Sequence, residues 1–583
     1  MVRNIFLLLG IALLINHAVI AAPQPTKPSQ CHCLPDEPCW PSESTWSAFN
    51  SAVGGNLIAT TPVARECHDP YYDKAKCDAI KKGYHDGNWR RSLPGAMIET
   101  TWETFHGQGC LGVNQTVPCN QGAVSIYTVK ATTIADVQTT IRFASEHNIR
   151  LTVKNTGHDF LGRSSAPSSI NLWLSSMKGI NITKDFIPDG APQGTQGQGA
   201  IILKSGVIWD EAYKAANDSN VVVVGAAHYS VGAAGGYCLG GGHSPISPHL
   251  GLCVDNVLQF TMVTADGQVH IANSHKNEDL FWALRGGGPG FGVVVEAVYR
   301  THPAFKNMIY ARATISTNDT VSMDKIMRDF YSRHDAWSSQ GWSAYVLGAQ
   351  GLLVLQFVLP DATVEQAASS FNPFLDYARS LPAVTLSNVD IFTDSTYYSW
   401  FNRYAPMFDQ TYAGVNTRIS SRFLPQSLFQ PDSLDLLSTT MKKVTGDIAS
   451  ISPAWAFFHL LIAGGQVKQG NSVETSVLPA WREALVLYIS FVGWDDSTPY
   501  ADQLTMAKKL TESTDALRAI TPGAGTYQNE GDPSEPDWQQ SFFGDNYPRL
   551  RALKNKYDPN SLFICRRCVG SEDWDEDLMC RQG

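Results

Sequence analysis

The 583-residue sequence has few of the motifs by which nucleotide and nucleic-acid sites are most often found. No glycine run is followed by the lysine of a Walker-A motif, so a P-loop is not indicated. The one match to Gly-x-Gly-x-x-Gly, at 107–112, follows no clear strand and precedes Pro118 and Cys119 rather than a helix, which argues against a Rossmann site. Basic residues are also few: the net charge is −10 and no basic stripe is present, which excludes a general nucleic-acid binder.

Long apolar runs are confined to the N-terminus. Arg3 precedes an apolar stretch over 5–20, and the small residues Ala21 and Ala22 follow it. This order predicts a secretory signal peptide over 1–22. An uncleaved membrane anchor is the alternative, but the stretch is short for a bilayer span and ends in small residues. We therefore expect a secreted protein that has no membrane attachment after cleavage.

The twelve cysteines agree with an oxidising compartment, because most of them gather near the two ends of the chain. Cys565 and Cys568 have the spacing of half a zinc site, but no second pair stands at ligand spacing, so we expect disulfides and no metal. The pairing stays open at this point. Four Asn-x-Ser/Thr sequons predict surface glycosylation, and they begin at Asn114, Asn181, Asn217 and Asn318.

After the predicted signal peptide, composition and hydrophobic periodicity change three times along the chain and divide it into four segments. Residues 23–118 are rich in Pro, Gly, Cys and Trp and show little periodicity, which indicates a cysteine-rich extension that covers the next domain. Strands and helices alternate over 119–303. Residues 304–525 predict an α+β domain with one antiparallel sheet backed by helices, and 526–583 form a separate C-terminal segment.

Within the alternating region the local signals are specific. Thr133 precedes an amphipathic helix and Asp136 follows three residues later, as in a capping box. The apolar strand 149–153 then leads into a glycine loop, and a buried strand over 221–224 leads into a second one. Ala265-Asp266-Gly267 lies between two apolar runs and predicts a hairpin.

Three glycine-rich loops are the most informative feature of the chain. They are Val-Lys-Asn-Thr-Gly-His-Asp-Phe-Leu-Gly-Arg-Ser at 153–164, Ala-Ala-Gly-Gly-Tyr-Cys-Leu-Gly-Gly-Gly-His at 233–243 and Arg-Gly-Gly-Gly-Pro-Gly-Phe-Gly at 285–292. Glycine lets backbone amides approach an anionic group without steric cost, so three such loops indicate a large anionic ligand.

This ordered set resembles the PCMH-type FAD-binding domain of the vanillyl-alcohol-oxidase family, and specifically the berberine-bridge-enzyme-like oxidoreductases. The segments 250–256 and 278–288 belong to the same pattern, and the tail segments 527–529 and 543–550 are similar to the C-terminal parts of that family that fold back onto the flavin. The resemblance covers about 119–303 and 526–564. The Lys-Asn-Thr-Gly-His-Asp version, the sequons and the cysteine-rich N-terminus are similar to the fungal isoamyl alcohol oxidase subgroup.

The implied fold class is α+β, with a PCMH-type FAD-binding domain made of two α/β subdomains and a separate α+β substrate domain. The implied cofactor is FAD, bonded through its 8α-methyl carbon to His158. The other cofactor-binding positions implied are the loop residues Asn155, Thr156, Gly157, Gly162 and Ser164, the glycines Gly235, Gly236, Gly240 and Gly241, and the tail residues Asn529 and Asn546. Many relatives have a second link through a cysteine two positions before the Gly-Gly pair. Ala233 stands there, and Cys238 is five residues further on, so we expect attachment through His158 alone.

Three residues are candidates for catalysis. Tyr527 matches a tail position that faces the substrate in the family, and Glu530 replaces the usual tyrosine and is a candidate base. A solvated surface acid is an equally good explanation of Glu530. His459 lies on a possible strand over 454–461, where a structural histidine is the commoner explanation.

These observations predict a secreted, glycosylated, FAD-dependent oxidase that takes a hydride from an alcohol, or a similar activated C–H centre, of a small organic molecule. The substrate could be a simple alcohol, a carbohydrate or a secondary-metabolite intermediate. Dioxygen is the expected acceptor because no nicotinamide site is found. A flavin dehydrogenase with another acceptor, and a ligand-binding protein that has lost turnover, remain alternatives; a zinc hydrolase has no ligand set. The sequence does not indicate the oligomeric state.

Overall fold

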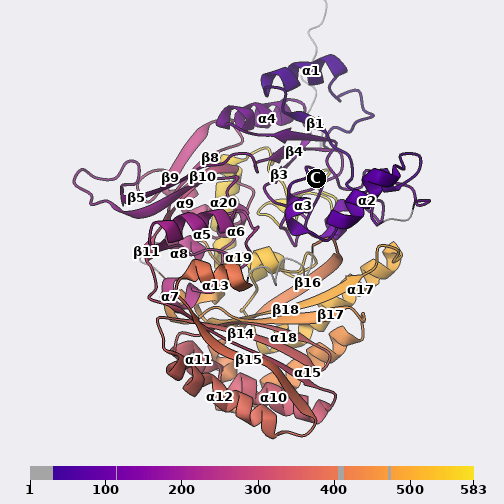
Figure 1. The fold of residues 1–583 in the computed structure, drawn as a ribbon. Coiled ribbons are helices and arrows are strands. Elements are labelled where there is room, and N and C mark those ends of the chain that lie inside the picture. The colour runs from indigo at the N-terminus through magenta and orange to yellow at the C-terminus, as the bar shows by residue number, and fades with distance from the viewer. Residues whose placement is uncertain (1–30, 113–114, 405–412, 471–473, 583) are drawn as a thin grey trace, which may run out of the picture.

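A computed structural model describes residues 31–112, 115–404, 413–470 and 474–582. The predicted signal peptide and the Asn114 sequon lie outside the described residues. The molecule consists of two units that lie one above the other in Figure 1. The upper unit contains a four-stranded, a five-stranded and a two-stranded sheet, and the lower unit contains a seven-stranded sheet.

The four-stranded sheet contains the strand that delivers the first glycine loop. Its order is β1-β2-β4-β3, in which β2, β4 and β3 run parallel and β1 pairs antiparallel at the edge. Helix α4 (Ile134–Glu146) connects β2 to β3, and it begins with the predicted capping box between Thr133 and Asp136. The strands are β1 (Leu57–Ala59), β2 (Tyr127–Lys130), β3 (Arg150–Lys154) and β4 (Ser169–Trp173).

The five-stranded sheet is antiparallel, with the order β5-β6-β10-β8-β9. The predicted hairpin is present between β8 and β9. Helices α5 (Trp209–Asp218) and α9 (Glu278–Ala283) contact this sheet. The predicted strand over 221–224 is reduced to β7 (Val221–Val222), which pairs with β11 (His302–Pro303). The five strands are β5 (Ile180–Phe186), β6 (Gln198–Lys204), β8 (Val257–Val263), β9 (Val269–Asn273) and β10 (Val293–Arg300).

The lower unit is built on the predicted antiparallel sheet, whose order is β15-β12-β14-β13-β17-β18-β16. Helices cover one face of it and bury a core that is separate from the core of the upper unit (Figure 1). The strands are β12 (Met308–Thr317), β13 (Ser343–Ala349), β14 (Leu352–Pro360), β15 (Val384–Asp394), β16 (Asn416–Pro425), β17 (Trp455–Leu461) and β18 (Ala484–Trp494). The covering helices are α10 (Thr320–Ser332), α11 (His334–Ser339), α12 (Val364–Ser380), α15 (Leu434–Ala449), α17 (Tyr500–Ser513) and α18 (Asp515–Ile520).

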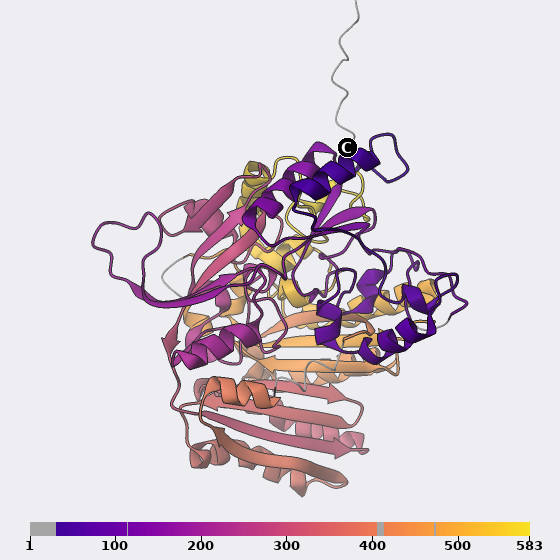
Figure 2. The same ribbon diagram turned by 45° about the horizontal axis from the view of Figure 1, so that its top comes forward.

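The C-terminal segment returns to the upper unit, as the resemblance implies. Helices α19 (Trp538–Phe543) and α20 (Tyr547–Tyr557) lie among its elements in Figures 1 and 2. Asp279 at the start of α9 accepts hydrogen bonds from Lys556 Nζ at 2.6 Å and from Tyr557 at 2.9 Å. The tail therefore connects to the unit that contains the glycine loops.

The N-terminal extension does more than cover the next domain, because it contributes β1 to the four-stranded sheet. It carries helices α1 (Glu43–Ala52), α2 (Lys74–Gly83) and α3 (Gly87–Arg91). The disulfide between Cys31 and Cys580 ties it to the end of the chain. The other disulfides are Cys33–Cys39, Cys67–Cys77, Cys110–Cys119, Cys238–Cys253 and Cys565–Cys568.

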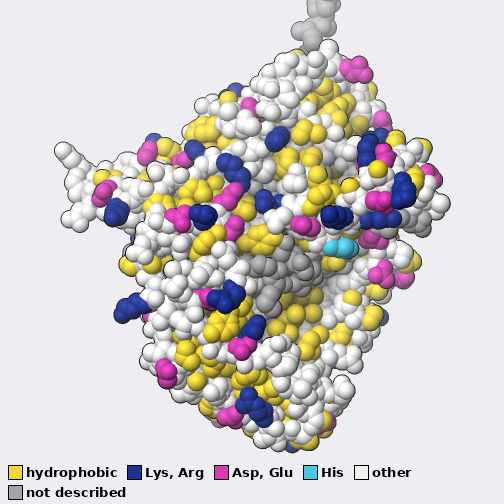
Figure 3. Space-filling model, viewed as in Figure 1, with side chains coloured by type: hydrophobic (Ala, Val, Ile, Leu, Met, Phe, Trp, Pro, Cys, Tyr) yellow, Lys and Arg dark blue, Asp and Glu magenta, His cyan; other side chains and the backbone are white. Residues whose placement is uncertain are grey.

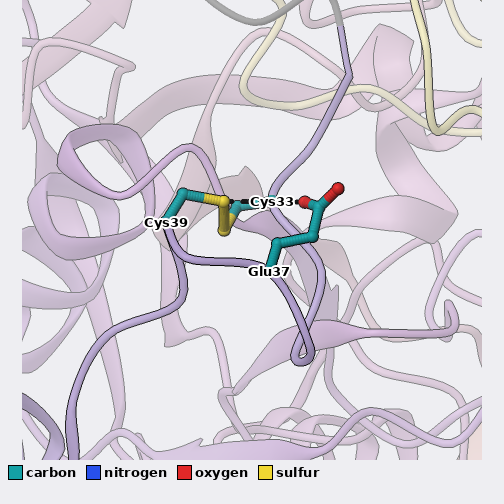
Figure 4. A group of neighbouring side chains, drawn as sticks. All are labelled: Cys33, Glu37 and Cys39. Atoms are coloured by element: carbon teal, nitrogen blue, oxygen red, sulfur yellow. Dashed lines mark hydrogen bonds between the residues drawn. A yellow bond between two sulfur atoms is a disulfide. The ribbon is translucent and has the colours of Figure 1, made fainter.

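Two pairs of cysteines that are spaced like metal ligands are disulfide-bonded instead. Cys565 and Cys568 are bonded to each other. Cys33 and Cys39 lie beside Glu37, but Figure 4 shows that their sulfurs are also bonded to each other. Thiolates are the zinc ligands, so neither pair offers them while its disulfide is intact.

The described surface has mixed charge. On the face shown in Figure 3, Lys and Arg side chains are interspersed with Asp and Glu. The sequon residues Asn181 and Asn318 are exposed, and Asn217 is partly buried in α5. In the described part of the chain, no helix combines the length and the apolar sequence that crossing a bilayer requires.

Candidate active site

A cavity of about 310 Å³ lies where the two units meet the C-terminal segment. The first two glycine loops form part of its wall, strands β13, β17 and β18 form another part, and the tail residues 527–530 contribute a third. Most of the predicted site residues line it: Asn155, Thr156, Gly157, His158, Ser164, Gly235, Gly236, Tyr527, Asn529 and Glu530.

The first glycine loop is held from below by the N-terminal extension. Gly157 has φ +87°, and a Cβ there would lie 3.2 Å from the carbonyl oxygen of Ala96, so both the turn and the contact require glycine. Lys154, at the end of β3, is buried, and its Nζ donates three hydrogen bonds at 2.7–2.8 Å to the carbonyls of Leu93, Pro94 and Ala96. Burial lowers the pKa of Lys154 to about 7. The extension thus fixes the loop that carries His158.

His158 has a defined environment at the cavity wall. Its Nε2 lies 2.7 Å from Ser230 Oγ, and the same hydroxyl lies 3.2 Å from His228 Nδ1. The rings of His158 and His228 meet edge to face with 4.6 Å between their centroids. Burial, and then the neighbours His228 and Arg91, lower the pKa of His158 well below its ordinary value. The imidazole is therefore neutral at physiological pH, which is the form that acts as a nucleophile.

The second glycine loop leaves open space beside the cavity. Gly235 has φ +126° and precedes the short helix α6 (Gly236–Leu239). A Cβ added at Gly235 or Gly236 would meet no atom within 4 Å, so both backbones border the cavity directly. Behind them, Cys238 is bonded to Cys253, and its sulfur is not available for a second flavin link while that disulfide is intact.

These residues fit FAD. A glycine-lined wall allows a planar ring system to approach the backbone closely, and the side chains of the Asn155 loop lie beside it. Asn155 Nδ2 donates to the carbonyl of Ser205, whereas its Oδ1 is buried without a hydrogen-bond partner in the described structure. A buried amide oxygen in that state is suited to a donor on a bound ligand.

The tail residue Asn529 joins the two glycine loops. Its Nδ2 donates to the carbonyls of Gly236 at 3.0 Å and Tyr237 at 3.1 Å. Its Oδ1 accepts a hydrogen bond of 3.0 Å from Arg163, which forms an ion pair with Asp159 in the first loop. Asn529 therefore holds the wall of the cavity together.

Tyr527 lines the cavity beside Asn529, but it is not suited to be a base. Its hydroxyl lies 2.7 Å from Asn529 Nδ2 and 3.3 Å from the carbonyl oxygen of Tyr237. Burial, and then the nearby Glu530 carboxylate, raise the pKa of Tyr527. The hydroxyl therefore keeps its proton at neutral pH and acts as a hydrogen-bond donor.

The carboxylate of Glu530 is paired with a histidine. His243 Nε2 lies 3.0 Å from Oε1 and 3.2 Å from Oε2 of Glu530. On the other side of the ring, His243 Nδ1 lies 3.4 Å from the hydroxyl of Tyr345. Burial raises the pKa of Tyr345 well above its ordinary value, so this hydroxyl is protonated and can donate to Nδ1. With Nδ1 as acceptor, Nε2 carries the hydrogen and donates to Glu530. Glu530 is thus a cavity residue with a fixed carboxylate rather than a solvated surface acid.

Three glycines predicted to contact the cofactor, Gly162, Gly240 and Gly241, are not among the residues that line the cavity. Gly162 faces the Trp102 ring, where a Cβ would approach to 2.2 Å, and Gly240 faces Asn529, where it would approach to 2.6 Å. A Cβ at Gly241 would lie 3.3 Å from Val477. Close packing of the loops is therefore enough to require glycine at all three positions, and their contact with the cofactor stays a prediction. The pattern could not separate the two roles, because packing and ligand approach both select glycine.

The predicted cofactor residue Asn546 also lies outside the cavity lining. Its Nδ2 donates hydrogen bonds of 3.2 Å to the carbonyls of Ser476 and Val477. Asn546 therefore fixes a backbone segment that packs against the third glycine loop, where Ser476 N donates to the carbonyl of Arg285 at 3.0 Å.

The catalytic candidate His459 faces away from the cavity. Side chains alternate along β17, so Phe458 and Leu460 line the cavity, whereas His459 points into the helix-covered core. There its Nε2 lies 2.7 Å from His334 Nε2. The sequence-based choice of His459 is corrected on this ground: the alternation defined two faces of the strand and did not identify which one meets the ligand.

The buried pair of histidines should make the protein less stable in acid. Burial lowers the pKa of His334 to about 4, and it lowers that of His459 well below its ordinary value. Below about pH 6.5 the unfolded chain binds protons that the folded chain cannot, so the free energy of unfolding falls as the pH falls. For His334 alone the expected loss between about pH 7 and pH 5 is about 2 kcal/mol.

Urea unfolding at the two pH values measures this loss. The loss should be smaller in His334→Gln than in the wild type, and it should be unchanged in His275→Gln, which alters an exposed histidine. An identical pH dependence in His334→Gln and the wild type would contradict the assignment.

Several cavity residues were not found from the sequence. His243 ends the Gly-Gly-Gly-His run, so its position beside a flexible backbone was a usable signal. His228, Tyr345 and Phe491 gave no comparable signal, because they lie far apart in the sequence and the sequence does not reveal which side of each element faces the cavity.

The comparisons with known proteins agree with this geometry. Residues 126–273 match a family described as an FAD binding domain, and residues 526–569 match the family described as berberine and berberine like. An uncharacterized FAD-linked oxidoreductase of Arthroderma benhamiae is 36% identical over 97% of both chains. A flavin-dependent oxygenase, ucdF, of Aspergillus ustus is 35% identical over 92% of this chain and 98% of its own. The crystal structure of the vanillyl-alcohol-oxidase-type flavoprotein MtVAO713 of Myceliophthora thermophila superimposes with a TM-score of 0.88 at 28% identity, covering 95% of this chain and all (100%) of that one.

The chain therefore belongs to the berberine-bridge-enzyme-like FAD-linked oxidoreductases, with the vanillyl-alcohol-oxidase-type fold. It is an FAD-dependent enzyme that acts on a small molecule. The recognition made from the glycine loops and the tail is confirmed, and so is the predicted α+β fold class with a PCMH-type FAD-binding domain.

Proposed function

We propose that this enzyme oxidises a hydroxyl-bearing carbon of a small organic molecule, with His158 as the single covalent link to FAD and Glu530 as the base. The observation that supports the reaction is the Glu530–His243 pair, which lies in the same cavity as His158 and the glycine-lined wall. It supplies one carboxylate, with fixed geometry, at the place where a substrate would meet the cofactor.

In the proposed reaction, side chains of the protein remove the proton of the substrate hydroxyl. The carbinol carbon of the substrate loses a hydride while its hydroxyl loses a proton, which leaves a carbonyl product. Glu530 takes that proton, and His243 holds the carboxylate in position through its Nε2 hydrogen bond. Tyr527 remains protonated, and its hydroxyl would exchange the 3.3 Å hydrogen bond to the Tyr237 carbonyl for one to the substrate oxygen. FAD held by His158 and the glycine loops would supply the hydride acceptor and the route by which the electron pair reaches dioxygen, with hydrogen peroxide as the second product.

We also propose that the enzyme works outside the cell. The described residues contain six disulfides and no unpaired cysteine, which suits an oxidising compartment. The exposed sequons at Asn181 and Asn318 are the expected glycosylation sites. A covalent cofactor has an advantage there, because a secreted enzyme cannot recover a flavin that it has lost.

An anaerobic experiment tests the proposed reaction. The purified protein should be yellow, and alcohol substrate should bleach the oxidised-flavin absorbance without oxygen. Admission of oxygen should restore the absorbance and release about one hydrogen peroxide per flavin reduced. Reduction by substrate with no reoxidation by oxygen would indicate a dehydrogenase. A flavin that dithionite reduces but no alcohol reduces would contradict the proposed reaction.

A further inference from the structure

One wall of the cavity is almost entirely apolar. The side chains that the seven-stranded sheet presents to it come from three neighbouring strands: Tyr345, Phe458, Leu460, Ile489 and Phe491. Register explains why they share a face, since Tyr345 lies opposite Leu460 and Phe458 lies opposite Ile489. The hydroxyl of Tyr345 is the one polar side-chain group among these five, and it is directed at His243.

The aromatic members of this wall are not fully packed. Phe458 and Phe491 meet edge to face with 5.1 Å between their centroids, and Phe160 from the first glycine loop meets Phe491 at 6.4 Å. All three are only partly buried, although they lie inside a cavity. Apolar surface left open to water in this way is stabilised when an apolar ligand covers it.

The polar groups of the cavity lie away from this wall and are engaged with one another. Glu530 pairs with His243, Asp159 pairs with Arg163, and Asn529 bonds to both glycine loops. A carbohydrate needs a series of donors and acceptors along its ring, because each hydroxyl that is buried without a partner costs free energy. In the described lining, the sheet offers no such series.

We infer that the substrate is a largely apolar, ring-bearing alcohol, whose ring lies among Phe160, Phe458 and Phe491 while its single hydroxyl is directed at Glu530, and that it is not a carbohydrate. This inference rests on the proposed function, which it deepens by naming the substrate class. The aromatic side chains provide affinity through buried area and ring contacts, and the carboxylate fixes the reacting end.

Binding and turnover can be measured separately. Cinnamyl alcohol is the ring-bearing probe, and cellobiose at the same concentration is the carbohydrate probe. Binding is followed as a shift of the flavin absorbance in Glu530→Gln, which should bind without turning over, and turnover is followed as anaerobic flavin reduction in the wild type. We expect cinnamyl alcohol to bind and to reduce the flavin, and cellobiose to do neither.

Paired variants locate the binding surface. Phe491→Ser and the milder Phe458→Leu should weaken cinnamyl alcohol binding, Phe491→Ser by about 10- to 100-fold, because a buried ring contact is lost. Phe457→Leu is the matched control, since Phe457 lies on the same strand but is buried on the opposite face. It should leave the affinity unchanged.

The outcomes separate the two proposals. Cellobiose that binds and reduces the flavin, with cinnamyl alcohol inert, would overturn the substrate class and leave the oxidation reaction standing. Cinnamyl alcohol that binds but never reduces the flavin would support the substrate class and count against the reaction. Failure of cinnamyl alcohol to bind, or equal loss of affinity in Phe457→Leu and Phe491→Ser, would overturn the substrate class.

Discussion

Replacing His158 with alanine should abolish covalent flavin. Acid precipitation of the wild-type protein should leave the yellow colour in the pellet, whereas the flavin of His158→Ala should pass entirely into the supernatant. The physical reason is that the proposed nucleophile is the imidazole of His158 at the cavity wall, which burial keeps in its neutral form. Joining its nitrogen to the 8α carbon displaces one hydrogen from each as a proton, and the electron pair released is taken up by dioxygen.

Mass spectrometry gives a second readout that does not depend on activity. The tryptic peptide that contains His158 should carry the mass of FAD in the wild type and no added mass in the variant. His275→Ala is the control, because it removes an exposed histidine and should leave the attachment complete. Covalent flavin that persists in His158→Ala, or a wild-type peptide found only in unmodified form from fully loaded protein, would overturn the attachment through His158.

The local signals of the upper unit predicted its elements well. The capping box at Thr133 marked the start of α4 to the residue, and the apolar run that precedes the first glycine loop corresponds to β3. Such signals work because a cap or a tight turn is decided by a few neighbouring residues. The three-residue strand β1 gave no signal, since its pairing with β2 is a contact between segments far apart in the chain.

The candidate site was predicted only where its residues lie close together in sequence. The loop around His158 and the tail around Asn529 were found from their motifs, and the structure places both at the cavity. The apolar wall was not found, because alternation along β17 is equally consistent with either face meeting the ligand. His459 was chosen and Phe458 was missed for the same reason: the helices that cover one face of the sheet are not visible in the strand's own sequence.

In the glycine loops, too, the sequence did not reveal which residues border the cavity. Gly235 and Gly241 both have positive φ, yet only Gly235 borders the cavity, whereas a Cβ at Gly241 would meet Val477. Backbone conformation therefore explains why each is glycine without revealing which one meets a ligand. Whether a glycine borders the cavity depends on tertiary packing, including the way the C-terminal tail packs against the loops, and a local sequence pattern does not contain this information.

Glu530→Gln should lower kcat by about 10²- to 10⁴-fold while leaving substrate affinity nearly unchanged, because the amide keeps the shape of the side chain and loses the ability to take a proton. The hydrogen bond from His243 Nε2 can still be made to the amide oxygen, so the geometry of the pair survives. The measurement is the rate of anaerobic flavin reduction in a single turnover, with substrate binding followed separately in the same variant.

Three further variants distinguish a catalytic base from a carboxylate with a purely structural role. Glu530→Asp keeps the charge on a shorter side chain and should fall between wild type and Glu530→Gln, whereas Glu483→Gln alters an exposed acid and should have no effect. His243→Gln removes the group that fixes the carboxylate and should lower the rate of reduction less than Glu530→Gln does, because the base itself remains. Unfolding measurements on each variant separate loss of the fold from loss of chemistry. A Glu530→Gln enzyme that reduces its flavin at the wild-type rate would exclude this carboxylate as the base, and the proton would then have to leave through another group of the cavity.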